Sequence, residues 1–251
     1  MLGIEGVHAA LVLDREIEAA VASVAEEPEP AASAAFAQLD RLFEDTSFAL
    51  SLVGPRVVIP VARWFAFEDL DMQAASGGGR SSKLHEILPL RSRAPATFDR
   101  ELAQQVVRDF LAFDIEGKPR KMIRVALARL KQALTRHNAG DAAVELSIAF
   151  EVLCGDEATT EMTHKVAVRA VRYLGGDAGQ RRRNHALVKK VYGIRSKLIH
   201  RGEEPAGTHR IGDSVLSTEA LLVEAASLCA ALIRKLLAGR AIPDWTAFDL
   251  L

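Results

Sequence analysis

Helix-start and helix-stop signals that alternate along the chain after residue 98 constrain its fold more than any other feature. Each of six apolar segments has hydrophobic residues at helical spacing, and most of them begin after a small polar residue and end before a glycine, which is the usual chemistry of helix caps. The fold class is therefore predicted to be mainly α, with a C-terminal helical bundle over residues 99–240 and a tail over residues 241–251. The expected helices cover residues 99–113, 120–136, 142–154, about 160–174, 182–199 and 218–238.

The first 98 residues carry weaker and mixed signals, so they are predicted to form a smaller region of unknown role with α+β character. Helical spacing covers residues 14–27 and 31–43. β-Branched and aromatic residues in 47–53 and 56–67 predict the two strands of a hairpin. The glycine- and serine-rich stretch 76–82 predicts a loop or linker.

Composition places the chain among ordinary globular proteins, since 49% of its 251 residues are hydrophobic and 26% are charged. No apolar run approaches the roughly 18–20 residues that a membrane span needs, and the N-terminus lacks the basic and apolar regions of a signal peptide. The two cysteines, Cys154 and Cys229, lie in apolar helical segments, which favours reduced core thiols. We therefore expect a cytoplasmic protein with no membrane partner.

The net charge of −1 hides a strong asymmetry along the chain. The first 30 residues hold seven acidic residues against Arg15 alone, whereas residues 160–210 hold twelve lysines and arginines, four acidic residues and four histidines. A basic segment of this kind favours a polyanion such as RNA, because phosphate contacts release bound counterions. The alternative is a solvated basic face that pairs with the acidic N-terminus.

The fifth predicted helix places an arginine at the edge of its apolar stripe and a histidine at its end. The stripe runs from Leu187 to Leu198. On a regular helix Arg195 lies about 40° from Val191 in the stripe, and His200 lies about 180° from it. The guanidinium needs a partner to be buried there, whereas the imidazole faces outward in the last turn, where the helix dipole favours its protonated form.

A carboxylate in the third predicted helix is the expected partner of this arginine. Glu151 is surrounded by apolar residues in the run IAFEVLCG, and a carboxylate in such a run needs a cation or hydrogen-bond donors. We therefore predict a Glu151–Arg195 ion pair. The alternative to a role in catalysis is a structural ion pair that only orients the two helices.

The residues around this pair resemble those of HEPN domains. The signature of that family is an Arg and a His separated by four residues, with a polar residue directly after the Arg, near the end of a bundle helix. The string YGIRSKLIHRGE at 192–203 is most similar to the ApeA-like branch of the family, as are IAFEVLCGDE at 148–157 and KVAVRAVRYLGG at 165–176. The resemblance covers about residues 120–238 and does not extend to residues 1–98.

The extended context carries this resemblance, since the bare spacing also occurs at Arg80 and His85 beside a glycine-rich loop. The resemblance implies a helical domain that often forms a homodimer, with the signature helices meeting across the dimer axis. Many members are metal-independent endoribonucleases in defence, toxin–antitoxin or RNA-processing systems. The implied function is therefore cleavage of RNA, in an antiviral-defence or toxin-like setting.

Carried over by position, the resemblance implies four catalytic residues, which are Arg195, His200, Ser196 and Glu151. In RNA the 2′-hydroxyl attacks the neighbouring phosphate once a base removes its proton, and an imidazole suits the base or the acid of that reaction. A planar guanidinium suits the phosphate oxygens and the transition-state charge. Ser196 would hold a phosphate oxygen or orient His200, which lies four residues further along the helix.

No metal or cofactor is expected, since the sequence has neither a His-Glu-x-x-His motif nor paired cysteines.

Basic residues of the segment 160–210 are the expected RNA contacts. The run at 181–183 has a plainer alternative, which is a solvated helix start. The full set of expected contacts is Arg181, Arg182, Arg183, Lys189, Lys197 and Arg201.

Two other functions stay open at this point. The first is a HEPN domain without catalysis, which serves as a dimerisation or RNA/nucleotide-binding module, with Arg195 in a helix-tying ion pair and His200 as a helix cap. The second is a regulatory or sensor subunit whose N-terminal region recognises a trigger, against which the short N-terminal region argues. RNA and a second copy of the chain are the expected partners, and an antitoxin or trigger partner has no sequence signal of its own.

Overall fold

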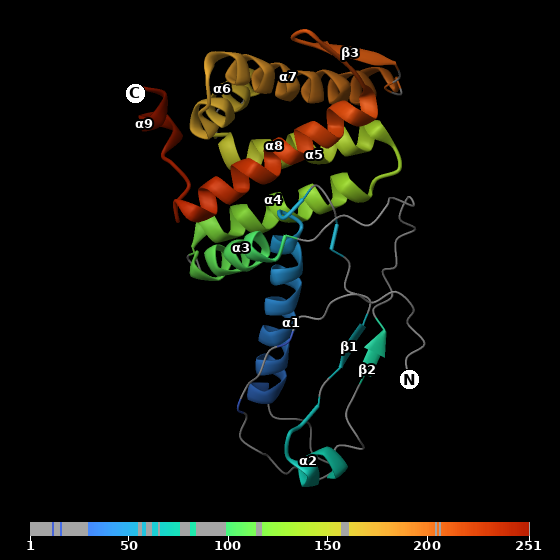
Figure 1. Ribbon diagram of the computed structural model, residues 1–251, viewed down its shortest axis with the longest axis vertical. Coiled ribbons are helices and arrows are strands. Elements are labelled where there is room, and N and C mark those ends of the chain that lie inside the picture. The colour runs from blue at the N-terminus through green and yellow to red at the C-terminus, as the bar shows by residue number, and fades with distance from the viewer. Residues whose placement is uncertain are drawn as a thin grey trace. The chain divides into compact units, whose positions relative to one another are not determined.

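A computed structural model confirms the mainly α fold (Figure 1). It divides into two compact units, one formed by residues 1–47 and 59–91 and the other by residues 48–58 and 92–251. The residues that it describes are 12, 16, 30–54, 57–58, 62–64, 66–75, 81–83, 99–113, 117–156, 161–203, 205 and 207–250.

The elements follow one another in a simple order, with helices before and after two short strand pairs. They are α1 (Pro30–Leu50), β1 (Ala62–Trp64), α2 (Leu70–Ala75), β2 (Ser81–Lys83), α3 (Arg100–Ala112), α4 (Lys118–Thr135), α5 (Ala139–Cys154), α6 (Met162–Leu174), α7 (Ala178–Arg201), β3 (Thr208–Ile211), β4 (Ser214–Ser217), α8 (Thr218–Ala238) and α9 (Trp245–Asp249).

The larger unit is a layered helical bundle built around α5 and α8. Figure 1 shows α6 and α7 on one side of these two helices and α3 and α4 on the other. Both central helices carry apolar residues around most of their circumference, and side chains such as Leu146, Phe150, Leu221 and Leu232 are fully or almost fully buried. This continuous core is what an all-helical layer arrangement requires, because each neighbouring helix buries only one face.

Side chains cap α3, α5, α7 and α8 as the capping chemistry predicts, with two shifts, whereas α4 and α6 begin without a side-chain cap. The side chains of Asp99 and Ser217 accept hydrogen bonds from backbone N–H groups in the first turns of α3 and α8. Asn138, and not Asp141 as expected, caps α5, since its side chain accepts from the N–H groups of residues 140 and 141. Asp177 caps α7, so this helix begins four residues earlier than the predicted 182.

The hairpin predicted over 47–53 and 56–67 is wrong. Residues 47–50 are the last turn of α1, which contains the predicted helix 31–43, and residues 51–54 form a turn. Burial explains the difference, since Ala49 and Leu52 are completely buried at the end of that helix. β1 pairs instead with β2, whose residues Ser81 and Ser82 belong to the predicted loop.

The predicted helix 14–27 and the loop residues 76–80 lie outside the described part of the chain, apart from residue 16.

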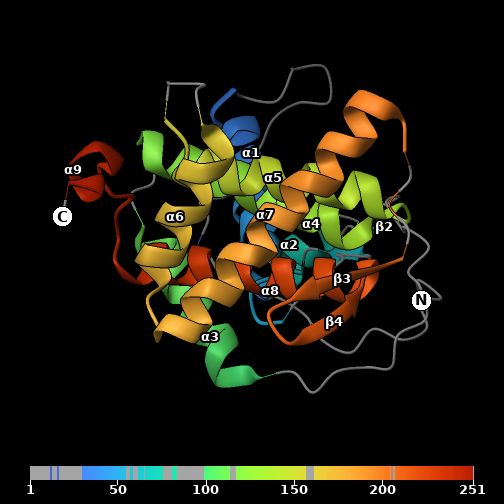
Figure 2. The ribbon, with the colours of Figure 1, turned by 90° about the horizontal axis from the view of Figure 1, so that it is seen from above.

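A second, antiparallel strand pair, β3–β4, was not predicted. Its strands are joined by Gly212 and Asp213, with Gly212 in the left-handed region at φ 59°. Figure 2 shows this hairpin and α6 on opposite sides of α7.

The segment expected to be a C-terminal tail contains α9, which packs on the bundle. The indole Nε1 of Trp245 donates to the Leu153 carbonyl oxygen at 2.9 Å, and Trp245 is only 6% exposed. Its ring also meets Tyr173 and Phe248 edge to face. Within the described residues, no helix combines the length and the apolar character needed to cross a bilayer.

Candidate functional site

The predicted Glu151–Arg195 ion pair is confirmed. Arg195 lies in the C-terminal half of α7, and its Nη1 donates to Oε1 of Glu151 on α5 at 2.9 Å. The two side chains are 33% and 26% exposed, so the pair lies at the edge of the core. A partly exposed guanidinium held by a single carboxylate keeps donors that a second anion can use.

The Arg195 guanidinium has unused hydrogen-bonding capacity at this position. Its Nε is buried and has no hydrogen-bond acceptor among the described residues. Its Cζ lies 5.9 Å from the centre of the Tyr192 ring, which is a loose cation–π contact. An unpaired buried donor is costly, but water does not reach the Nε, so the donors open to a phosphate oxygen are those on the exposed part of the guanidinium.

Tyr192 fixes the distance between α5 and α7 beside the ion pair. Its hydroxyl donates to the Ser147 carbonyl oxygen at 3.3 Å, and the residue is only 5% exposed. Burial, followed by the negative charge of Glu151, raises the pKa of Tyr192 well above its usual range. The phenol therefore stays neutral and acts as a donor that positions α7 over α5.

His200 and Ser196 lie on the exposed side of α7 and not beside the ion pair. Both residues are exposed, and His200 is in the last turn of the helix, before the cap at Gly202. On a regular helix His200 lies about 140° around the axis from Arg195 and about 7.5 Å further along it. Among the described contacts, none joins Arg195 to His200, so one chain presents the two groups on different faces.

The predicted RNA contacts divide into side chains that are exposed and side chains that form ion pairs with other described residues. Arg181, Arg182, Lys189 and Lys197 are exposed on α7. Arg183 instead forms an ion pair of 2.5 Å with Glu224 on α8, so it ties two helices together. The guanidinium of Arg201 lies 3.7 Å from Glu203 at the surface.

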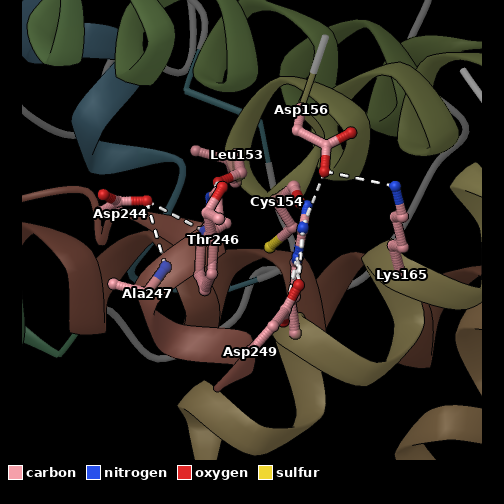
Figure 3. Close-up of polar contacts among 10 residues, drawn as sticks. Leu153, Cys154, Asp156, Lys165, Asp244, Thr246, Ala247 and Asp249 are labelled. Atoms are coloured by element: carbon pink, nitrogen blue, oxygen red, sulfur yellow. Dashed lines mark hydrogen bonds and ion pairs between the residues drawn. The ribbon is translucent and has the colours of Figure 1, made fainter. Parts of the chain in front are cut away.

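A second arginine site, which the sequence analysis did not identify, closes the C-terminal end of α5. Arg169 on α6 is 2% exposed, and its Nη1 donates to the Cys154 carbonyl oxygen at 2.9 Å. Its other nitrogens donate to Asp156 at 2.8 Å and to both oxygens of Asp249 at 2.7–3.2 Å (Figure 3). Lys165 also approaches Asp156, at 3.5 Å. We name this group, with Trp245, the C-terminal clasp.

The clasp satisfies backbone carbonyls that the end of a helix leaves without partners. Arg169 and Trp245 bind the carbonyl oxygens of Cys154 and Leu153, and the N–H of Gly155 donates to that of Glu151 at 2.7 Å. The sequence contained the signal, since Arg169 lies within an apolar helical run, as Arg195 does. The pattern does not identify the partner, because Asp249 is 80 residues away.

The cysteines, the surface hollows and the acidic and histidine side chains as metal ligands supply no candidate chemistry among the described residues. Both cysteines are free and completely buried, and burial raises the pKa of Cys229 to about 12, so these thiols are inert. Two shallow hollows lie along α3, and none of the predicted site residues lines them. Among the described residues, no group of three or more His, Cys, Asp or Glu side chains is placed to hold a metal ion.

Comparison of the chain with protein-family models, with curated proteins and with solved structures finds no match in any of the three. The candidate site is therefore argued from its own geometry and chemistry.

Proposed function

We propose that this protein is a metal-independent endoribonuclease of the HEPN type, in which Arg195 binds the scissile phosphate and His200 transfers protons. One observation carries the proposal. Glu151 holds a guanidinium that is one-third exposed and, among the described residues, forms its one ion pair through a single nitrogen, on the same helix that ends in an exposed histidine. A positioned cation with spare donors beside a group that titrates near neutral pH suits phosphodiester chemistry.

In the proposed reaction the 2′-oxygen of a nucleotide forms a bond to its own 3′-phosphorus as the bond from that phosphorus to the 5′-oxygen of the next nucleotide breaks. An imidazole of His200 accepts the proton of the 2′-hydroxyl. The leaving 5′-oxygen receives a proton from an imidazolium or from water. Arg195 neutralises the charge that builds up on the non-bridging oxygens, and Ser196 donates a hydrogen bond to the phosphate or to His200.

A homodimer is part of this proposal. Glu151 holds Arg195 toward α5, whereas His200 projects from a different side of α7. A second copy of the chain that packs against the C-terminal half of α7 would bring its His200 to the Arg195 of the first. Light scattering tests this directly, with a dimer expected and a monomer at tens of micromolar counting against a shared site.

A non-catalytic dimerisation or RNA/nucleotide-binding module is the second candidate. The separation of Arg195 and His200 within one chain favours it, since an ion pair alone needs no nearby histidine. The basic side chains of α7 would then bind RNA without cleaving it. A role in antiviral defence or as a toxin and a location in the cytoplasm remain predictions from the resemblance and composition.

Cleavage assays separate the two candidates. The full-length protein is incubated with mixed RNA in EDTA beside Arg195→Ala, His200→Ala and the control Arg100→Ala, which removes an exposed arginine from the start of α3. We expect at least about a 100-fold loss of cleavage in the first two variants, which is typical of lost acid–base or charge stabilisation, and no loss in the control. RNA binding without cleavage by the wild-type protein would support the binding module instead.

A further inference from the structure

The unpredicted β3–β4 hairpin brings a histidine to a basic side of α7. β3 packs beside α7, on the side away from α6 (Figure 2). Lys190 and Lys197 lie seven residues apart, about two helical turns, so they share this side. Both lysines are exposed, and among the described residues neither has an ion-pair partner. Two unneutralised cations therefore face the hairpin.

Hydrogen bonds fix the ring of His209 on β3. Its Nε2 lies 2.9 Å from the Thr218 hydroxyl at the start of α8, and that hydroxyl donates to the Gly207 carbonyl oxygen at 3.3 Å. The hydrogen bond between Nε2 and the hydroxyl fixes the position of the ring in either tautomer of the neutral imidazole. A nearby anion would favour the imidazolium, in which both ring nitrogens donate.

The charges around His209 are mostly positive. Burial, followed by the positive charges of Lys190 and Lys197, lowers the pKa of His209. The N-terminal end of the α8 dipole adds a partial positive charge, and Glu219 in the first turn of α8 opposes it. Arg210, the next residue on β3, donates to the Gly212 carbonyl oxygen at 3.3 Å. β4 contributes no titratable side chain, and Leu216 is the register partner of His209.

We propose that Lys190, Lys197 and His209 form a phosphate-binding subsite for a nucleotide that flanks the scissile phosphodiester. This inference rests on the proposed function, because it makes RNA the ligand. On a regular helix the two lysines lie about 240–260° from Val191, with His200 at about 180° and Arg195 at about 40°. An RNA strand that crosses the end of α7 would meet the subsite on one side, His200 in the middle and Arg195 on the other side.

Nuclear magnetic resonance of the histidine rings tests the subsite without any cleavage. The full-length protein is titrated between pH 5 and 8 alone, with inorganic phosphate, and with a 2′-O-methyl RNA oligonucleotide that lacks terminal phosphates and the 2′ nucleophile. We expect added anion to raise the pKa of His209, since a nearby negative charge favours the imidazolium. A response to the oligonucleotide alone identifies an internal phosphodiester as the ligand, and a response to both identifies phosphate in general. An unchanged His209 signal in both arms would overturn the proposal.

Paired lysine variants supply the second test. Lys190→Gln with Lys197→Gln is compared with Lys118→Gln and Lys121→Gln, which removes two exposed charges from the first turn of α4. We expect only the first variant to weaken oligonucleotide binding. The slope of log K against log salt concentration should become shallower by about 0.7 for each phosphate of the single strand that the variant no longer neutralises.

The two proposals fail in distinguishable ways. If the lysine pair is needed for binding but Arg195→Ala and His200→Ala leave cleavage unchanged, or the wild-type protein does not cleave, the subsite stands and the nuclease proposal fails. If cleavage depends on Arg195 and His200 while the lysine pair behaves like its control, the nuclease stands and the subsite fails.

Discussion

Two arginines reach α5 from neighbouring helices, and they differ in how completely their donors are used. Arg169 is 2% exposed and binds two carboxylates and one carbonyl oxygen. Arg195 is one-third exposed, binds Glu151 through one nitrogen and leaves a buried Nε without an acceptor. A fully satisfied buried arginine fixes structure, whereas an incompletely satisfied one at the surface is suited to bind an anion.

The same contrast applies to the acids of α5. Glu145, in the N-terminal half, is 6% exposed and receives Arg129 at 2.9 Å and Arg136 at 2.6 Å. Glu151, six residues later, is 26% exposed and receives one arginine. Glu145 is thus buried and fully paired, as a structural ion pair should be, whereas Glu151 at the candidate site is partly exposed and has one partner.

Loss of Arg169 should have the largest effect. Arg169→Met removes hydrogen bonds from one buried cation to two carboxylates and a carbonyl oxygen. Because the carboxylates of Asp156 and Asp249 are 26% and 37% exposed and water can solvate them, the total cost should be about 3 kcal/mol of stability. Arg195→Met should cost about 1 kcal/mol or less, because its pair is partly exposed. Urea unfolding measures both. Equal losses in the two variants would contradict the division between a structural and a ligand-binding arginine.

A matched pair of substitutions on α5 should give the intermediate effect. Glu145→Gln keeps one acceptor oxygen, and the arginines that it binds are 38% and 46% exposed, so the two weakened hydrogen bonds together should cost about 1–2 kcal/mol. Glu151→Gln weakens one such bond at a site that water reaches, for which about 1 kcal/mol or less is expected. The free energy of unfolding in urea should therefore fall more for Glu145→Gln. The reverse order would show that Glu151 is chiefly structural.

The smallest expected effect is a difference in pH dependence between the C-terminal clasp and His185 on α7. The pKa of Arg169 is raised, chiefly by its hydrogen bond to Asp249, so the clasp keeps its cation at every pH that the fold survives. His185 on α7 meets His164 with ring centres 6.3 Å apart, and burial, then the charges of Lys189 and His164, lower its pKa. The unfolded chain therefore takes up this proton at a higher pH than the folded chain does.

The lowered pKa of His185 determines how the free energy of unfolding changes with pH. The free energy of unfolding should fall as the pH drops below about 6.5, the usual histidine value, and level off once folded His185 is also protonated. His185→Gln should remove this part of the decrease. The measurement is a series of urea unfolding curves between pH 5 and 8, and identical pH profiles for the variant and the wild type would show that His185 makes no such contribution.

The parts of this structure that the sequence predicted are those in which a local pattern meets a simple physical rule. Helical spacing and capping residues located α3 to α8 within a few residues, and the need to pair a charge in an apolar run linked Glu151 to Arg195 across 44 residues. Asp141 is also a good capping residue by type, but Asn138 caps α5 because its side chain accepts two backbone hydrogen bonds.

The parts that were missed depend on distant contacts or on short elements. Residues 47–53 have strand-like composition, but burial of Ala49 and Leu52 keeps the helix and turn. The hairpin at Gly212 has a two-residue turn signal, yet its strands are only four residues long. Asp249, one of the two carboxylate partners of Arg169, lies 80 residues away, and no local pattern identifies such a contact.

The clasp also affects when the end of α5 becomes stable during synthesis of the chain. Trp245 and Asp249 come at least 90 residues after the carbonyl groups at the end of α5 that the clasp satisfies. As the chain emerges from the ribosome, α5, α6 and α7 are available to one another well before α9 is made. The turn of α5 that carries Glu151 should therefore exchange its amide hydrogens readily in nascent chains and become protected only when residues 245–249 dock.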